Sequence, residues 1–347
     1  MEGYALAKMT SRQRVRAVLN GEIPDRVPID FTDWLLEGIL LILIVVFSII
    51  ANNFLTIGNL WNIVRSISFK GIIACFVTMV IVAGEMDLSV GSTVALAGVI
   101  TAIVNKTLVG FGMNSTLGCI IGMIITLIIS GCLGYMMSIF VTKLTVPSFI
   151  VTLAGMQIFK GCALIIANGF PIQGYPKWFK FLGSGYVGPV PFPAIVFIIL
   201  LCITWFIMRH TPFGRSIYAI GSNREAAKLS GINVNGIRTT IFVLTSISAG
   251  LAGILVSAQL NSGSPNVGAS YEMDVISSVI IGGASLSGGS GTIKGTLIGC
   301  IFLGVILNAM TLLGISDYWQ YVIRGSLILF AVFLNTMVRG RLRSKGL

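Results

Sequence analysis

Residues 209–238, RHTPFGRSIYAIGSNREAAKLSGINVNGIR, form the only long polar stretch after the N-terminal segment in a chain of otherwise apolar segments. Within this stretch, Glu225-Ala226-Ala227 is followed four residues later by Gly231. The two alanines would give a helix a surface that another protein can approach closely. Gly231 would end that helix because glycine adopts the left-handed conformation at no steric cost. We therefore predict a short helix over residues 223–230, capped by Asn223 or Ser222, that transmits force to a soluble partner.

The composition of the chain is that of a membrane protein. Hydrophobic residues make up 55% of the sequence, charged residues only 10%, and the mean hydropathy is +0.94. A soluble domain normally carries about 25% charged residues. Most basic residues lie at the ends of apolar segments, where the positive-inside rule places them. The net charge of +11 therefore indicates membrane topology, and we expect a lipid bilayer and no nucleic acid as a partner.

The apolar pattern predicts an all-α, polytopic integral membrane protein with about ten transmembrane helices in residues 34–338. The predicted spans are 36–52, 63–83, 90–108, 116–140, 146–167, 191–208, 239–259, 272–287, 293–313 and 319–337. Six spans separate the basic N-terminal segment from the 209–238 loop, and four more separate that loop from the basic tail 339–347. Even numbers put all three on one face, which the positive-inside rule makes cytoplasmic.

The stretch GRSIYAIGSNREAAKLSGINV, residues 214–234, resembles the EAA-type coupling loop of ABC-transporter permeases, specifically the ribose/xylose/galactose-type sugar permeases. The resemblance extends over residues 35–343. It implies that residues 209–238, here named the coupling loop, contact an ABC ATPase subunit. The residues that carry this implied role are Gly214, Arg215, Asn223, Glu225, Ala226, Ala227 and Gly231.

The sequence also contains an internal repeat. GEMDLSVGS, residues 84–92, reappears as GGASLSGGS, residues 282–290, and the first copy resembles the family signature G-G-I-D-L-S-V-G-S with Glu85 in place of its second glycine. Irregular backbone at membrane depth is tolerated only where protein or a water-filled cavity satisfies it, so duplicated breaks indicate a transport path. The alternative is a pair of short turns that are glycine-rich only for close helix packing.

Several polar residues are candidates for the path. Those in the repeat are Asp87, Ser89, Gly91, Ser287 and Gly289. Gln157, Asn261 and Asn308 could hydrogen-bond a sugar hydroxyl or simply bridge helices.

Charged residues within the apolar segments need partners. Asp87 could line the path or cap a helix, whereas helix capping is the favoured interpretation for Glu272 and Asp274. Lys160 and Arg324 require partners or an aqueous cavity, and Lys70 is expected near the outer end of its span.

Residues 1–33 form a soluble segment of different character. Residues 9–31, MTSRQRVRAVLNGEIPDRVPIDF, resemble the opening of the uroporphyrinogen-decarboxylase/corrinoid-methyltransferase family. So short a match cannot build an active site. We expect a fused or misjoined start without activity.

The resemblance implies the permease subunit of an ATP-driven importer in the bacterial plasma (inner) membrane, with both termini cytoplasmic. An extracytoplasmic binding protein would deliver a monosaccharide, and a second permease copy, identical or paralogous, would complete the path. We expect no enzymatic activity, bound cofactor or metal in this chain, because ATP would be used by the separate ATPase subunit. The alternatives are an ion-coupled secondary transporter of a small polar solute, and a signalling or scaffold membrane protein.

Overall fold

A computed structural model describes residues 30–316, 318–327, 329 and 333. Most of these residues are helical. The helices are α2 (Asp30–Ile50), α3 (Ile57–Val82), α4 (Val90–Gly110), α5 (Ser115–Thr142), α6 (Ser148–Ile166), α7 (Phe179–Ser184), α8 (Phe192–His210), α9 (Pro212–Ser222), α10 (Arg224–Leu229), α11 (Val234–Leu260), α12 (Tyr271–Ile281) and α13 (Ile293–Leu312). Residues 318–327 form a further helix. A two-residue antiparallel pair, β1 (Tyr186–Val187) and β2 (Val190–Pro191), lies between α7 and α8.

The membrane character predicted from the sequence is confirmed. Seven described helices, α3, α4, α5, α6, α8, α11 and α13, are long and apolar enough to cross a membrane, and the apolar part of α2 is shorter. The predicted count of ten is approximate. The predicted span 272–287 is wrong in its second half, because α12 ends at Ile281, before Gly282 and the positive-φ Gly283. Eleven helical residues cover only about 16 Å. The predicted span 319–337 lies partly outside the described residues. Residues 1–29 and the basic tail 339–347 lie wholly outside them.

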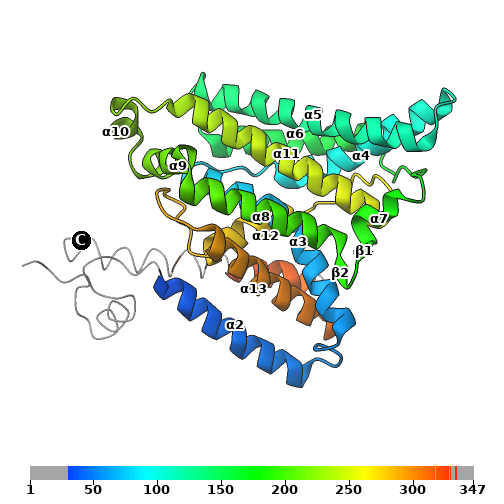
Figure 1. The fold of residues 1–347 in the computed structure, drawn as a ribbon, viewed down its shortest axis with the longest axis horizontal. Helices are drawn as coiled ribbons and strands as arrows, with labels where there is room; N and C mark the ends of the chain where they lie inside the picture. Colours follow the sequence, from blue (N-terminus) through cyan, green and yellow to red (C-terminus); the bar gives the residue numbers. More distant parts are fainter. Residues whose placement is uncertain (1–29, 317, 328, 330–332, 334–347) are drawn as a thin grey trace, which may run out of the picture.

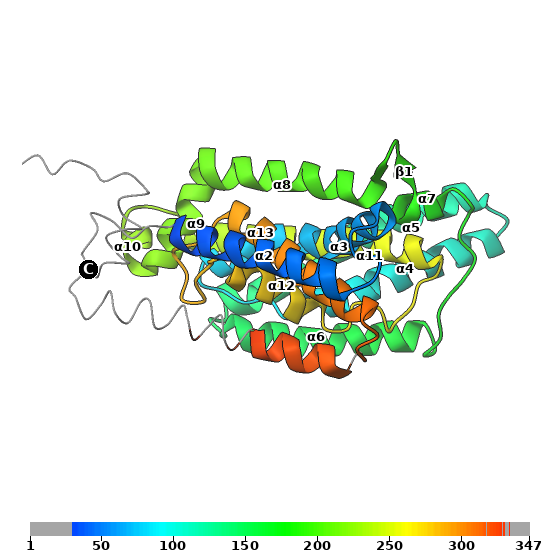
Figure 2. The same ribbon diagram turned by 90° about the horizontal axis from the view of Figure 1, so that it is seen from below.

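The long helices run roughly along one axis, with α9 and α10 at one end of the bundle and α7, β1 and β2 at the other (Figures 1 and 2). The coupling loop is therefore separated from α7, β1 and β2 by the length of the bundle.

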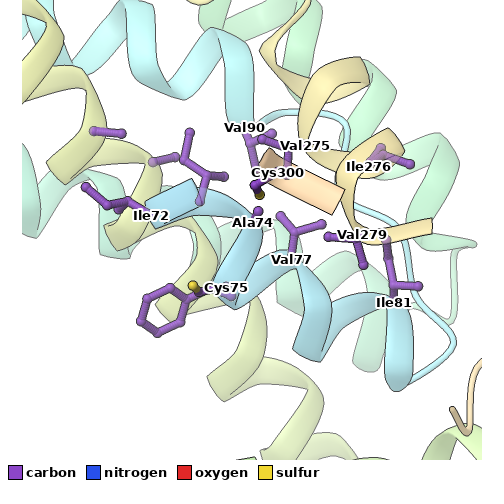
Figure 3. Packing of buried hydrophobic residues seen from close by; sticks show 14 of the residues in the cluster. Ile72, Ala74, Cys75, Val77, Ile81, Val90, Val275, Ile276, Val279 and Cys300 are labelled. Carbon is purple, nitrogen blue, oxygen red and sulfur yellow. The ribbon is translucent and has the colours of Figure 1, made fainter. Parts of the chain in front are cut away.

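The core is built around α3 and α11. Ile72, Cys75 and Val77 of α3 are fully buried, and their cluster includes Val275 and Val279 of α12 (Figure 3). α11 packs against α3, α4 and α5. Small residues allow close approach: a Cβ on Gly253 of α11 would overlap the backbone of Val94 in α4. Glycine at helix contacts is typical of membrane bundles, where packing rather than water exclusion holds helices together.

The chain re-enters the bundle directly after α3. Residues 84–89, here named the first break, form an irregular segment that opens with a turn, and α4 begins after it at Val90. Glu85 contacts Arg238 near the start of α11, whereas Val94 lies against Gly253, about 15 residues further along that helix and thus roughly 22 Å deeper. The first break therefore carries the chain deep into the bundle, and α4 starts inside it.

A second irregular segment enters from the opposite end. After α11 ends at Leu260, Gly263 packs on Gly98 and Gly268 packs on Gly91 of α4. Residues 261–270, here named the second break, thus run antiparallel to α4 and bring the start of α12 to the depth at which α4 begins. Discontinuous helices that start side by side inside a membrane bundle are a known feature of transporters.

Candidate functional site

The coupling loop contains the predicted short helix. α10 spans Arg224–Leu229, and its cap is Asn223, whose side chain accepts a hydrogen bond from the Ala226 amide at 3.0 Å. Gly231 follows with φ +81°, in the left-handed region that favours glycine. The predicted helix, its cap and its glycine stop are therefore confirmed.

The two alanines of the loop face different ways, which corrects the expectation that both form one surface for a partner. Ala226 is exposed. Ala227 is only 4% exposed and packs with Ile220 of α9 and Val234 of α11 in a small core of the loop itself. Consecutive helical residues point about 100° apart, so adjacent alanines cannot both face the same partner.

An apolar side chain stands beside Ala226. Leu229 is 88% exposed, and it lies three residues after Ala226, on the same helical face. Glu225 is also exposed, in the first turn of α10. This face of α10 therefore presents a small side chain beside an exposed leucine.

α9 fixes the coupling loop to the membrane bundle. The Tyr218 hydroxyl donates to the Gly291 carbonyl at 2.7 Å, and the Gly289 amide donates to the Val82 carbonyl at 2.9 Å. Gly221 lies between these segments, because a Cβ there would overlap the Val82 carbonyl oxygen. Gly214 and Arg215 belong to the first turn of α9, with Gly214 buried against the end of α8 and Arg215 exposed.

We predict that Gly221→Ala destabilises this junction. The added methyl group would collide with the backbone of Val82 and Gly289, neither of which is a flexible side-chain end. Overpacking of this kind costs about 1–3 kcal/mol. The measurement is the thermal unfolding midpoint in detergent. Gly161→Ala on α6 is the matched control, since its Cβ would meet nothing within 4 Å. Equal midpoints for the two variants would contradict the close packing.

The two copies of the sequence repeat meet beside this junction. A Cβ on Gly288 would lie 2.9 Å from the Gly84 Cα, so the second copy packs on the start of the first break. Ser287 is exposed, and its hydroxyl forms a hydrogen bond with the Ser285 hydroxyl. The Gly289 amide donates to the Val82 carbonyl. The second copy is a loop between α12 and α13 and does not start a helix.

The first copy positions the start of α4. Asp87 is fully buried, and one of its carboxylate oxygens accepts from both the amide and the hydroxyl of Ser89, at 2.9 Å and 2.6 Å. Gly91 is enclosed by Glu272 and the Gly268 carbonyl. Asp87 thus orders the first break, whereas its second oxygen is buried without a hydrogen-bond partner among the described residues.

Glu85, a residue for which the sequence suggested no partner, joins the coupling loop to the first break. It is 4% exposed and pairs with Arg224 at the start of α10 and with Arg238 of α11, the latter at 2.7 Å. A buried carboxylate between two arginines therefore links the exposed helix to the segment that re-enters the bundle.

A second polar region lies on the other side of α3. A partly open cavity of about 290 Å³, here named the α3–α13 cavity, is lined by α3, α12, α13 and the helix at residues 318–327. Its polar lining includes Asn62, Ser66, Lys70, Asp274, Asn308 and Arg324.

Three of these residues form an ion cluster. Asp274 is 2% exposed, and its carboxylate oxygens contact Lys70 Nζ at 2.6 Å and Arg324 Nε at 2.9 Å. Arg324 therefore has the partner that its apolar surroundings require, and Asp274 does more than complement its helix terminus. The expectation that Lys70 lies near the outer end of its span is wrong, because α3 begins at Ile57 and Lys70 is close to its middle.

The remaining candidates are dispersed. Asn308 exchanges two 2.9 Å hydrogen bonds with Asn59, so it bridges α3 and α13 as well as lining the cavity. Gln157 is exposed on α6, and Asn261 ends α11 in the left-handed conformation with φ 52°. Lys160 of α6 donates to the Pro265 carbonyl in the second break at 2.5 Å. Sequence spacing alone could not separate these roles, because each depends on which helix lies opposite.

Known proteins are similar to this chain over nearly its whole length. The family model described as branched-chain amino acid transport system / permease component matches residues 59–332. The ribose import permease protein of Escherichia coli K12 is 38% identical, over 87% of this chain and 94% of its own. The L-arabinose ABC transporter permease protein of Azospirillum brasilense is 33% identical, over 89% of each chain. The xylose transport system permease protein of Haemophilus influenzae is 31% identical, over 82% of this chain and 90% of its own.

No solved structure matches the chain. The family match starts at residue 59, and the expected resemblance of residues 9–31 to the uroporphyrinogen-decarboxylase family finds no support in these comparisons. Those residues also lie outside the described part of the chain.

Proposed function

The chain belongs to the family of branched-chain amino acid transport system permease components, and from that premise we propose that it forms the membrane path of an ATP-driven importer for a monosaccharide. It is a multi-pass inner-membrane permease component and not an enzyme, since ATP hydrolysis in such importers resides in a separate subunit. Relatives named for ribose, L-arabinose and xylose support a small sugar as the solute, in spite of the amino-acid name of the family.

The exposed face of α10 is the observation that supports ATPase docking most directly. Ala226 and Leu229 are exposed on α10, which lies at one end of the bundle (Figure 1), and the buried Ala227 packs α10 against α9 and α11. An extracytoplasmic binding protein would contact the opposite end, around α7, β1 and β2. The positive-inside rule places the coupling loop and both termini in the cytoplasm. A second permease copy, identical or paralogous, would complete the path.

Movement of the coupling loop has a direct route into the bundle. Glu85 connects α10 to the first break, in which Asp87 and Ser89 lead into the start of α4, where Gly91 packs on Gly268. ATP-driven closure of the ATPase subunits would displace α10, and the ion pairs would pass this displacement to the first break. Access to the path would thereby alternate between the two membrane faces.

The test is uptake of D-ribose, L-arabinose and D-xylose into vesicles that hold the purified chain, the ATPase that co-purifies with it and its binding protein. We expect uptake of at least one sugar that requires ATP and continues when a protonophore and an ionophore dissipate ion gradients. Uptake that does not depend on ATP and that is abolished by the ionophores would instead establish the ion-coupled alternative. If the chain captures no ATPase and transports none of the sugars, the result would favour a signalling or scaffold role.

A further inference from the structure

The α3–α13 cavity presents polar side chains where lipid cannot satisfy them. Asn62, Ser66 and Lys70 are spaced by four residues and so share one face of α3, a helix long and apolar enough to span a membrane. Asn62 and Ser66 are exposed, and Lys70 keeps 20% of its side chain accessible. Polar groups in hydrocarbon without partners are costly, so this face has to meet water, a polar ligand or another protein.

The ion cluster gives the cavity a polar wall inside the bundle. Asp274 pairs with both Lys70 and Arg324, so two cations surround one carboxylate. Breaking such a buried pair is strongly unfavourable, which keeps all three side chains in place. The lysine carries three donor hydrogens and the arginine five, and the carboxylate uses only some of them. Both side chains line the cavity.

The remaining lining suits a small neutral polyol. Asn62 and Ser66 add donors and acceptors on α3, Asn308 adds an amide on α13, and Ile67 and Leu303 supply apolar surface. A volume of about 290 Å³ is at the lower end of the range for pockets that hold small molecules, roughly 300–1,000 Å³. Alternating hydroxyl and C–H surfaces of a monosaccharide match a wall of this mixed character.

We propose that the α3–α13 cavity is a sugar-binding station of the transport path, in which Lys70, Asp274 and Arg324 hold sugar hydroxyls near the start of α12. The inference rests on the proposed import of a monosaccharide and specifies where in this chain the sugar is held. It assigns to Asn62 and Ser66 a role in contacting the solute.

The first test is Ser66→Leu, which fills the exposed face of α3 with a side chain that suits a membrane helix. We expect ATP-driven sugar uptake to fall by about tenfold or more, as for the loss of one or two net hydrogen bonds to the ligand, with unchanged ATPase capture. Ser48→Leu on α2 is the matched control, because Ser48 does not line the cavity. Normal uptake by Ser66→Leu would overturn the proposal, and failure of wild-type uptake would instead refute the importer function.

The second test does not require transport. Ser66→Cys in the assembled complex should react with a water-soluble, thiolate-selective reagent faster than the six native cysteines, because Cys75, Cys119 and Cys300 are buried and a thiol that faces lipid does not ionise. D-ribose, L-arabinose or D-xylose, whichever the wild-type complex imports, should slow this reaction at millimolar concentration. Labelling that no sugar slows, or that only an anionic solute slows, would contradict a sugar station. An unreactive thiol that cross-links to a second copy would show that this face is a subunit interface.

Discussion

We expect Ala226→Arg to abolish ATP-driven sugar uptake and to leave the membrane bundle intact. Ala226 is exposed and lies on the same face of α10 as Leu229, which is 88% exposed. If that face enters a pocket on the ATPase, an arginine side chain would have to be buried there without a partner, at a cost of several kcal/mol. We expect loss of ATPase capture by at least about a hundredfold, which corresponds to roughly 3 kcal/mol.

Two measurements on the same membranes check this result: ATPase co-purification and the uptake of sugar. Ala226→Ser is the matched control, because serine keeps the surface small, and it should retain both activities. Ala227→Arg tests the orientation of the helix. Ala227 is buried among Ile220 and Val234, so this variant should lower the stability of the loop itself. Full ATPase capture by Ala226→Arg would refute docking on this face, whatever Ala227→Arg does.

The coupling loop was largely predictable because its signals are local. Asn223 caps the start of α10, Gly231 ends the helix, and the residues between them favour helical structure. Each of these effects operates within one or two helical turns. Which alanine would be buried was not predictable, because that depends on Ile220 and Val234 from neighbouring helices.

The long spans were predictable from hydropathy, and the short one was not. α12 follows an irregular segment and ends at a glycine pair, yet residues 272–287 are apolar enough to suggest a full span. Hydropathy measures the preference for an apolar environment, and the interior of the bundle satisfies that preference as well as lipid does. The start of α12 beside Gly91 is fixed by contacts with a distant segment, which no local pattern encodes.

The partners of the charged residues were likewise not predictable from local sequence. The sequence indicates that Arg324 needs a partner, but Asp274 and Lys70 come from helices far apart in the chain. The one available signal was the spacing of Asn62, Ser66 and Lys70, which predicts a polar stripe on a membrane helix. Glu85 carried no such signal, because its partners lie in the coupling loop and in α11.

Glu85→Gln should uncouple ATP hydrolysis from sugar transport. Glutamine keeps the shape of the side chain but removes the charge that holds Arg224 and Arg238. Arg238 is only 6% exposed and would lose its buried counter-ion, a change that typically costs about 3–5 kcal/mol when a pair is broken. Since α10 would still present Ala226 and Leu229, the ATPase should bind as before. The displacement of α10 would no longer reach the first break.

The expected result is therefore ATPase capture within about twofold of wild type and sugar uptake reduced by at least about tenfold, so that the ATP hydrolysed per sugar rises by the same factor. Glu37→Gln is the matched control, because Glu37 is exposed on α2. A role in folding alone would instead lower the amount of complex and reduce hydrolysis and uptake together, leaving their ratio unchanged. Arg224→Ala should give a smaller effect in the same direction, since the Arg224 side chain is 45% exposed and Arg238 remains paired. An unchanged ratio in both Glu85→Gln and Arg224→Ala would refute transmission through these ion pairs, because the connection from α10 to the first break would then have to run through other contacts of α9.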